Sequence, residues 1–227
     1  MINSGSTRKY IFYAIGEIAL VVIGILIALQ INNWNELKKE ADFERKVLNE
    51  LEVSIQREVD LLERGIDRNN EAIFSCNIIL RHFEEEIPYH DSLDYHFSSS
   101  LQLFFPSINN NAYEGPKSYG LHLIKNDSIR DALGETYEWS YVDRLSLRQD
   151  EYFFSTISPI LTDLFGSNEF RGKMKPLDYD HLTKSVKYTH ILRTLLSNRK
   201  WQSSIFRLAM DRRHDLSALI REELDNR

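Results

Sequence analysis

The sequence of 227 residues contains a single cysteine, Cys76. One cysteine cannot form a disulfide within the chain, and it cannot supply a CxxC metal site. Cys76 lies in an apolar helical stretch, so we expect a small buried side chain rather than a nucleophile. Proline and glycine are also few, at 5 and 9 residues, and there is no internal repeat. About 190 residues lie outside the long apolar run described below, which is enough for one domain with a sizeable core.

The sequence also lacks the short motifs that mark common enzymes. It has no nucleotide-binding glycine loop, zinc-protease motif, GxSxG elbow or EF-hand loop. The Glu-x-x-His spacing with which helical bundles hold two iron ions is absent as well. His90, Asp91, Asp94 and His96 follow Pro88, but such a cluster in a polar connector is more often a solvated loop than a metal site. We therefore expect no enzyme, no cofactor and no bound metal.

Acidic residues outnumber basic ones, and the formal net charge is −6. A mildly acidic chain binds polyanions poorly, so we expect no nucleic-acid partner. One segment differs, because residues 184–213 hold eight Lys or Arg and one acid, Asp211. This basic run is either a docking face for anionic lipid or an acidic partner, or the complement of acidic residues on the first long helix. The second interpretation is favoured.

The most distinctive feature that the sequence does contain is one long apolar run. Residues 11–31 read IFYAIGEIALVVIGILIALQI, and as a helix they would span about 31 Å, which matches the hydrocarbon core of a bilayer. The run is too long for a signal peptide, and no small-x-small cleavage site follows it. We predict a short tail over residues 1–9, a transmembrane helix over 10–31 in contact with the lipid bilayer, and a soluble domain over 32–227.

The orientation of the predicted span follows from its flanking charges. Arg8 and Lys9 stand directly before it, which favours a cytoplasmic N-terminus. Four further cations lie within residues 38–46, so a plain count does not decide. We expect a cytoplasmic tail and a C-terminal domain outside the cytoplasm.

The span carries one acidic residue, Glu17, about two turns from its start. A carboxyl at that depth faces protein or water, is protonated, or reaches the headgroups. Gly24 and Ala28 form a small-xxx-small pair, and Glu17 and Gly24 are seven residues apart, so they share a face. We interpret Glu17, Gly24 and Ala28 as a face for a partner helix. Proton chemistry at Glu17 and a carboxyl without a partner are the alternatives.

Two stretches resemble a known family. The first comprises residues 13–18, YAIGEI, and residues 22–36, VIGILIALQINNWNE. The second comprises Ala112, Tyr113, Glu114, Lys117, Ser118, Gly120, Leu123, Ile124, Lys125, Asn126, Ile129, Arg130, Leu133 and Tyr137. They are similar to an uncharacterised family of bacterial membrane proteins, the domain of unknown function 6090. The resemblance implies one span and a helical domain in Gram-negative bacteria, and it implies no activity. We expect the span to lie in the inner membrane. Gly115-Pro116 departs from the family pattern and speaks against a continuous helix there.

The rest of the chain has helical periodicity. Before Pro88, apolar residues recur in steps of three and four and their multiples, which predicts a long amphipathic helix. Leu51, Leu62 and Ile73 are eleven residues apart, as are Ile55 and Ile66, and this period predicts a nearly straight bundle helix rather than a coiled-coil dimer.

Further helices are expected later in the chain. One follows a cap at Asn126 or Asp127, with Ile129, Leu133, Tyr137 and Val142 on its core face, and kinks or restarts at Ser158-Pro159. A last long helix begins at Asp178 or Asp180. The fold class is therefore all-α, with one transmembrane helix followed by an antiparallel bundle of long helices.

These features indicate a membrane-anchored interaction or scaffold protein that assembles with itself or with a membrane protein. A small-molecule sensor or binding module is one alternative, and a subunit of a proton-linked membrane machine that uses Glu17 is another. A well-formed pocket between helices with convergent polar groups would favour the sensor.

Overall fold

The computed structural model describes residues 4–104, 106, 108, 111–138, 149–166 and 172–226. The chain divides into two compact units, Met1–Asn49 and Glu50–Arg227. The described residues form helices and irregular segments, and none of them belongs to a strand. This confirms the predicted all-α class.

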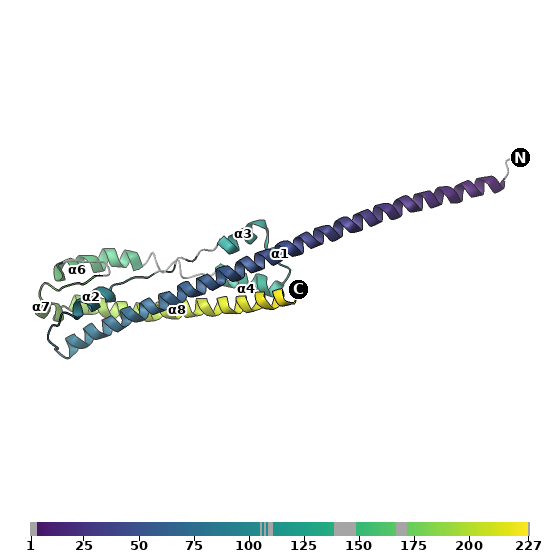
Figure 1. Ribbon diagram of the computed structural model, residues 1–227. Helices are drawn as coiled ribbons and strands as arrows, with labels where there is room; N and C mark the ends of the chain where they lie inside the picture. The colour runs from purple at the N-terminus through teal and green to yellow at the C-terminus, as the bar shows by residue number, and fades with distance from the viewer. Residues whose placement is uncertain are drawn as a thin grey trace. The chain divides into compact units, whose positions relative to one another are not determined.

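The first element, α1, is one α-helix, Ser4–Glu84 (Figure 1). Its 81 residues include no proline, so no backbone amide is missing from its ladder. The helix ends in a Schellman motif, in which the amide of Ile87 donates to the carbonyl of His82 at 3.0 Å and Glu86 adopts a φ of 52°. The end falls just before Pro88, as predicted.

The C-terminal part of the chain forms two helices rather than the single one expected. Asp178 caps α7, Tyr179–Thr183, by accepting a hydrogen bond from the amide of His181. Ser185, in extended conformation, then caps α8, Val186–Asp225. The expected start at Asp178 is therefore right, but the second cap at Ser185 divides the helix.

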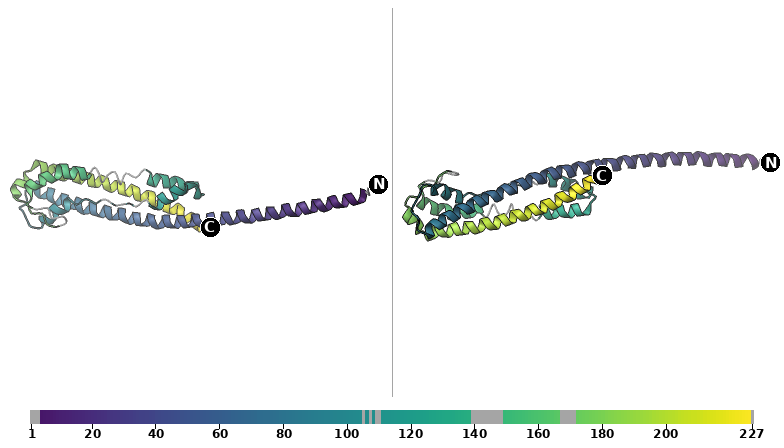
Figure 2. Two further views of the ribbon diagram at one scale, coloured as in Figure 1. Left: turned by 90° about the horizontal axis from the view of Figure 1, so that it is seen from above. Right: turned by 60° about the horizontal axis from the view of Figure 1, so that its bottom comes forward.

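α8 runs antiparallel to the part of α1 that belongs to the same unit, and Figures 1 and 2 show the two helices side by side. Side-chain contacts set the register, because residue numbers rise along α1 as those of their partners on α8 fall. The contacts join Glu52 to Ser217 and Arg221, Glu58 to Arg213, Asn69 to Ser203, and Glu84 to Arg193. This confirms the antiparallel arrangement of long helices.

The contact between the two helices follows a seven-residue pattern, with buried positions in alternating steps of four and three. On α1 these positions, the α1 seam, are Leu51, Ile55, Glu58, Leu62, Gly65, Asn69, Ala72, Cys76 and Ile79. On α8 they are Tyr188, Leu192, Leu195, Arg199, Gln202, Phe206, the half-buried Ala209, Arg213, Leu216 and Ile220. This repeat is that of left-handed helix packing.

The predicted eleven-residue period is therefore wrong for this face. Ile66 and Ile73, which supported it, are only half-buried. Gly65, Asn69 and Ala72 occupy the seam instead. Such residues add little or nothing to a hydrophobic pattern, so the pattern marked the edge of the buried face rather than its centre.

Shorter helices cover the long pair (Figures 1 and 2). They are α2 (Leu93–Ser100), α3 (Asn111–Tyr119), the 3-10 turn η1 (Leu121–Leu123), α4 (Asp127–Tyr137), the π-helical turn η2 (Phe153–Ile157) and α6 (Ser158–Leu164). α4 packs on α8. Rings from α2, α8 and the residue after α6 meet at one end of the unit, where Phe97, Phe165 and Tyr188 have centroids 5.3–6.4 Å apart.

Three local predictions have clear outcomes. Asn126 does cap α4, because its side chain accepts from the amides of Ser128 and Ile129. The restart at Pro159 is confirmed as a wide π turn directly before α6. The break at Gly115-Pro116 is wrong, since α3 continues through both residues. Val142 lies outside the described residues.

Candidate functional site

The first candidate site is the apolar part of α1. Its most apolar window contains no buried residue, and the large side chains from Tyr13 to Ile31 that the structure describes are all exposed. Among the described residues, α1 is the one helix long and apolar enough to cross a membrane. A continuous exposed apolar surface of this kind requires a cover in an aqueous environment.

The three residues of the predicted partner face lie within this segment. Glu17, Gly24 and Ala28 are all exposed. A Cβ added at Gly24 would meet no atom within 4 Å. The structure places the three residues on one helix, and their role as a partner face stays a prediction.

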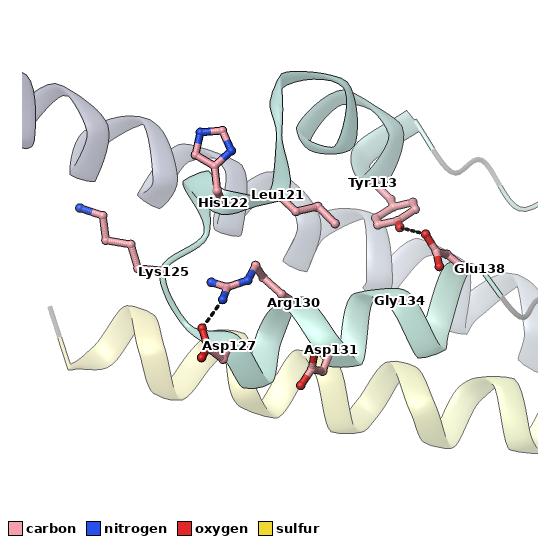
Figure 3. A pocket seen from close by; sticks show the side chains of 9 residues that line it. All are labelled: Tyr113, Leu121, His122, Lys125, Asp127, Arg130, Asp131, Gly134 and Glu138. Carbon is pink, nitrogen blue, oxygen red and sulfur yellow. Dashed lines mark hydrogen bonds and ion pairs between the residues drawn. The ribbon is translucent and has the colours of Figure 1, made fainter.

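The second candidate site is an open cavity of about 700 Å³ formed by α3, η1 and α4 (Figure 3). Its lining comprises Tyr113, Leu121, His122, Lys125, Asp127, Arg130, Asp131, Gly134 and Glu138. In Figure 3, Leu121 points from η1 toward Tyr113, and Gly134 lies on α4 below them. Cationic side chains stand at one end of the cavity and Glu138 at the other.

Tyr113 fixes the acidic end of this cavity. Its ring stacks on that of Tyr137, with centroids 4.9 Å apart and planes 8° from parallel. Its hydroxyl donates to a carboxylate oxygen of Glu138 at 3.0 Å, and the Lys117 ammonium lies 3.1 Å from the same oxygen. The hydrogen bond from Lys117, followed by that from Tyr113, lowers the pKa of Glu138, so this carboxyl stays ionised well below neutral pH.

The cationic end is fixed by Arg130. Its guanidinium pairs with Asp127 and donates to the carbonyl of Ile124 at 2.5 Å. Asn126, next to Asp127, donates to Glu223 on α8 at 2.7 Å. The turn before α4 is therefore tied both to α4 itself and to α8, and the cavity has a defined wall.

Gly134 lies inside α4, where glycine costs about 1 kcal/mol relative to alanine. A Cβ at this position would meet no atom within 4 Å. Packing among the described residues therefore gives no reason for a glycine. The free space above Gly134 opens into the cavity, so a molecule bound there could approach the α4 backbone closely.

Pairing between the basic run and acidic residues of the first long helix was expected, but burial of such a pair in the seams was not. Glu58 and Arg213 form an ion pair, with 2.8 Å between the Arg213 Nε and a Glu58 oxygen, and their side chains are 3% and 2% exposed. The other Glu58 oxygen accepts from Ser54 at 3.0 Å and from Tyr137 at 3.2 Å. Burial and the nearby Glu58 carboxylate raise the pKa of Tyr137, so Tyr137 remains a hydrogen-bond donor. The ion pair at the centre of the cluster is buried, and we interpret the cluster as structural.

Arg199 is a second buried cation on the α8 seam. It donates to the carbonyl of Gln102 at 2.5 Å and to the side chain of Gln149 at 3.5 Å. Within the described parts of the chain, no carboxylate lies within salt-bridge distance of it. Burial lowers its pKa to about 10 and raises that of the nearby Cys76 thiol to about 11. Cys76 is buried as predicted, and its thiol is protonated at neutral pH.

The histidines and aspartates after Pro88 do not converge on one point, although His90 and Asp91, which are neighbours in the sequence, lie 3.3 Å apart. His90 contacts Ser92 at 2.8 Å, Asp94 accepts from Tyr89 at 2.6 Å, and His96 contacts Ser75 at 3.1 Å. In the described parts of the chain, no three His, Cys, Asp or Glu side chains come together as a metal site requires.

Several cations of the basic run on α8 have partners within the chain. Arg213 pairs with Glu58, Arg193 pairs with Glu84 at 3.3 Å, and Arg212 donates to the carbonyl of Glu135 at 3.0 Å. The interpretation that these cations complement acidic residues of the first long helix, namely Glu50, Glu52, Glu58, Asp60 and Glu63, therefore holds for Arg213. Arg193 pairs instead with Glu84, near the end of α1.

Comparison with known proteins adds one match. The model of a family of unknown function, DUF6090, matches residues 17–153. This range includes most of the apolar segment of α1 and all residues that line the cavity. No curated protein and no solved structure matches the chain.

Proposed function

The chain belongs to the DUF6090 family, whose function is unknown, and we propose that it is a membrane-anchored, non-enzymatic helical protein that assembles with itself or with a membrane partner. One observation carries the proposal: the apolar window of α1 has no buried residue. Transfer of apolar surface from water into lipid is favourable by roughly 25 cal/mol per Å², so burial of about 140 Å² offsets the roughly 2.5–3.5 kcal/mol that a single carboxyl in the span costs.

The proposal includes a location and an orientation. We place the span in the inner membrane of a bacterium and the unit Glu50–Arg227 outside the cytoplasm, because Arg8 and Lys9 directly precede the span. The face of Glu17, Gly24 and Ala28 is the surface to which a partner span binds. A carboxyl in a membrane is tolerated when a neighbouring helix satisfies it, and small residues let that helix approach.

Membrane retention tests the anchor. The full chain is expected to stay with the membrane fraction after an alkaline carbonate wash. Two arginines in the span, Ile23→Arg with Ile27→Arg, are expected to release most of it, because each costs about 2.5–3.5 kcal/mol in mid-membrane. Val186→Arg, at an exposed position of α8, is the matched control and should not change retention. Extraction of the wild-type chain by carbonate would overturn the proposal.

The cavity beside α4 favours a second candidate function, a binding module for a small molecule. Polar groups converge on it from α3, η1 and α4, and the backbone is open at Gly134. Because both cationic and anionic side chains line the cavity, a polar molecule fits better than an apolar one. A compound that raises the melting temperature of the wild-type chain but not that of Gly134→Phe would support this function.

The open space at Gly134 gives a prediction that needs no ligand. Gly134→Ala is expected to raise the free energy of unfolding by up to about 1 kcal/mol, because alanine favours the helix and its Cβ meets no atom. Urea unfolding of the full chain in mild detergent, followed by circular dichroism, measures the change. A destabilised variant would mean that this space is filled in solution.

A further inference from the structure

The pattern of the α1 seam continues toward the N-terminus of the same helix. In unchanged steps of three and four it passes Leu48 and Glu44, which are buried, and then reaches exposed positions. We call these exposed positions the N-terminal stripe: Ala41, Leu37, Trp34, Gln30, Ile27, Ile23 and Leu20. Trp34 and Leu37 are 63% and 56% exposed, and the Lys38 ammonium lies 6.0 Å from the centre of the Trp34 ring.

We propose that the N-terminal stripe is the contact between two copies of this chain, packed as parallel helices through the membrane and just beyond it. The inference rests on the membrane anchoring proposed above, since anchoring gives both copies the same orientation and depth. A twofold axis then places each stripe position against its own counterpart. Confinement to one membrane raises the effective concentration, so a short contact suffices.

The stretch just outside the span distinguishes a second copy from lipid. In residues 32–43, the apolar side chains Trp34, Leu37 and Ala41 lie on the stripe, and the remaining positions except Phe43 are polar or charged. Lipid headgroups would surround this part of the helix on all sides. They do not explain why its apolar residues lie on one side and continue the spacing of the buried α1 seam. A helix packed on that side accounts for it.

Charges beside the stripe match a parallel pair. In a parallel pair of helices, the residue directly before a seam position lies close to a residue of the partner helix. The number of that partner residue is higher by five. For the seam position Ala41 these are Glu40 and Arg45, which are opposite in charge and exposed. The symmetry of a dimer forms this attraction twice.

Gln30 supports the same geometry. It is the stripe position nearest the end of the apolar run, and its side chain is exposed. A side-chain amide both donates and accepts, so two copies of Gln30 across a twofold axis satisfy one another. At 3.6 residues per turn, the face of Glu17, Gly24 and Ala28 is about one third of the circumference away. That face remains open to a different partner while the stripe is occupied.

Cysteine cross-linking in native membranes tests the stripe. Single substitutions Trp34→Cys, Leu37→Cys and Ala41→Cys in the full chain are each expected to give a disulfide-linked dimer on mild oxidation. Asn35→Cys and Lys39→Cys, on the opposite side of the helix, should give no more dimer than the wild type, whose Cys76 is buried. Equal linking at all five positions, or at none, would overturn the inference.

Charge exchange provides an independent test in the Leu37→Cys background. Glu40→Lys or Arg45→Glu alone should lower the dimer yield, by about tenfold in the association constant, because two attractions become repulsions. The two changes together should restore the yield, and failure to restore it counts against the parallel stripe. Disulfide linking through Ala28→Cys but not through the stripe positions would contradict the stripe contact and leave the proposed function intact. Failure of the wild-type chain to stay in the membrane would contradict both.

Discussion

Glu58→Gln is expected to lower the free energy of unfolding of the unit Glu50–Arg227 by about 3–5 kcal/mol. The substitution preserves shape and an acceptor for Ser54 and Tyr137, but it leaves Arg213 charged and buried without its counter-ion. The loss therefore reports the desolvation of one unpaired charge. Urea unfolding of the full chain in detergent, followed by circular dichroism, measures it, since the span remains helical in the micelle.

A second pair joins the same two helices and serves as the control. Glu84 and Arg193 lie 3.3 Å apart with side chains 64% and 63% exposed. Glu84→Gln should therefore cost only about 0–1 kcal/mol. Combining Glu58→Leu with Arg213→Met should recover much of the stability lost in either single variant, because no charge is then left unpaired. A cost for Glu58→Gln no larger than that for Glu84→Gln would contradict the buried pair.

The apolar helix could be predicted because its signal is local. A run of apolar residues long enough to cross a bilayer is visible without knowing what it touches. The end of α1 and the caps at Asn126 and Asp178 could also be predicted, since they depend on residues within a few positions. The break at Ser185 was missed, although its serine side chain is the same kind of cap signal.

The seam was predicted incompletely because it is not uniformly apolar. Glu58, Asn69, Arg199, Gln202 and Arg213 occupy core positions that a hydrophobic pattern assigns to the surface. What permits their burial is a partner far along the chain, such as Ser203 for Asn69 at 3.2 Å. Sequence periodicity contains no information about that pairing.

The cavity was missed for a related reason. Its walls come from α3, η1 and α4, and its polar ends exist because Lys117 reaches Glu138 and Arg130 folds back to Ile124. Lys117, Ile124 and Arg130 belong to the stretch that carries the family resemblance. Their hydrogen bonds within this corner of the fold supply a structural reason for that residue pattern.

Phe206→Ala should cost about 3–5 kcal/mol, because the ring is 1% exposed and fills the contact between the two seams beside Leu62. Gly65 is the opposing α1 residue. A Cβ there would lie 2.8 Å from the Cε2 of Phe206 and 3.3 Å from the Cδ1 of Phe104. The steric overlap in Gly65→Ala should therefore lower the free energy of unfolding by about 1–3 kcal/mol. The higher helix propensity of alanine offsets about 1 kcal/mol of this loss.

The double variant separates this explanation from a general effect of either substitution. Once Phe206 is alanine, the Cβ at Gly65→Ala has space, fills part of the cavity and keeps its helix propensity, so the combined cost should be clearly smaller than the sum. Gly134→Ala is the matched glycine control, because no atom lies within 4 Å of its added Cβ. Additive costs for Gly65→Ala and Phe206→Ala would mean that the ring does not limit how closely α1 and α8 approach at this level of the seam.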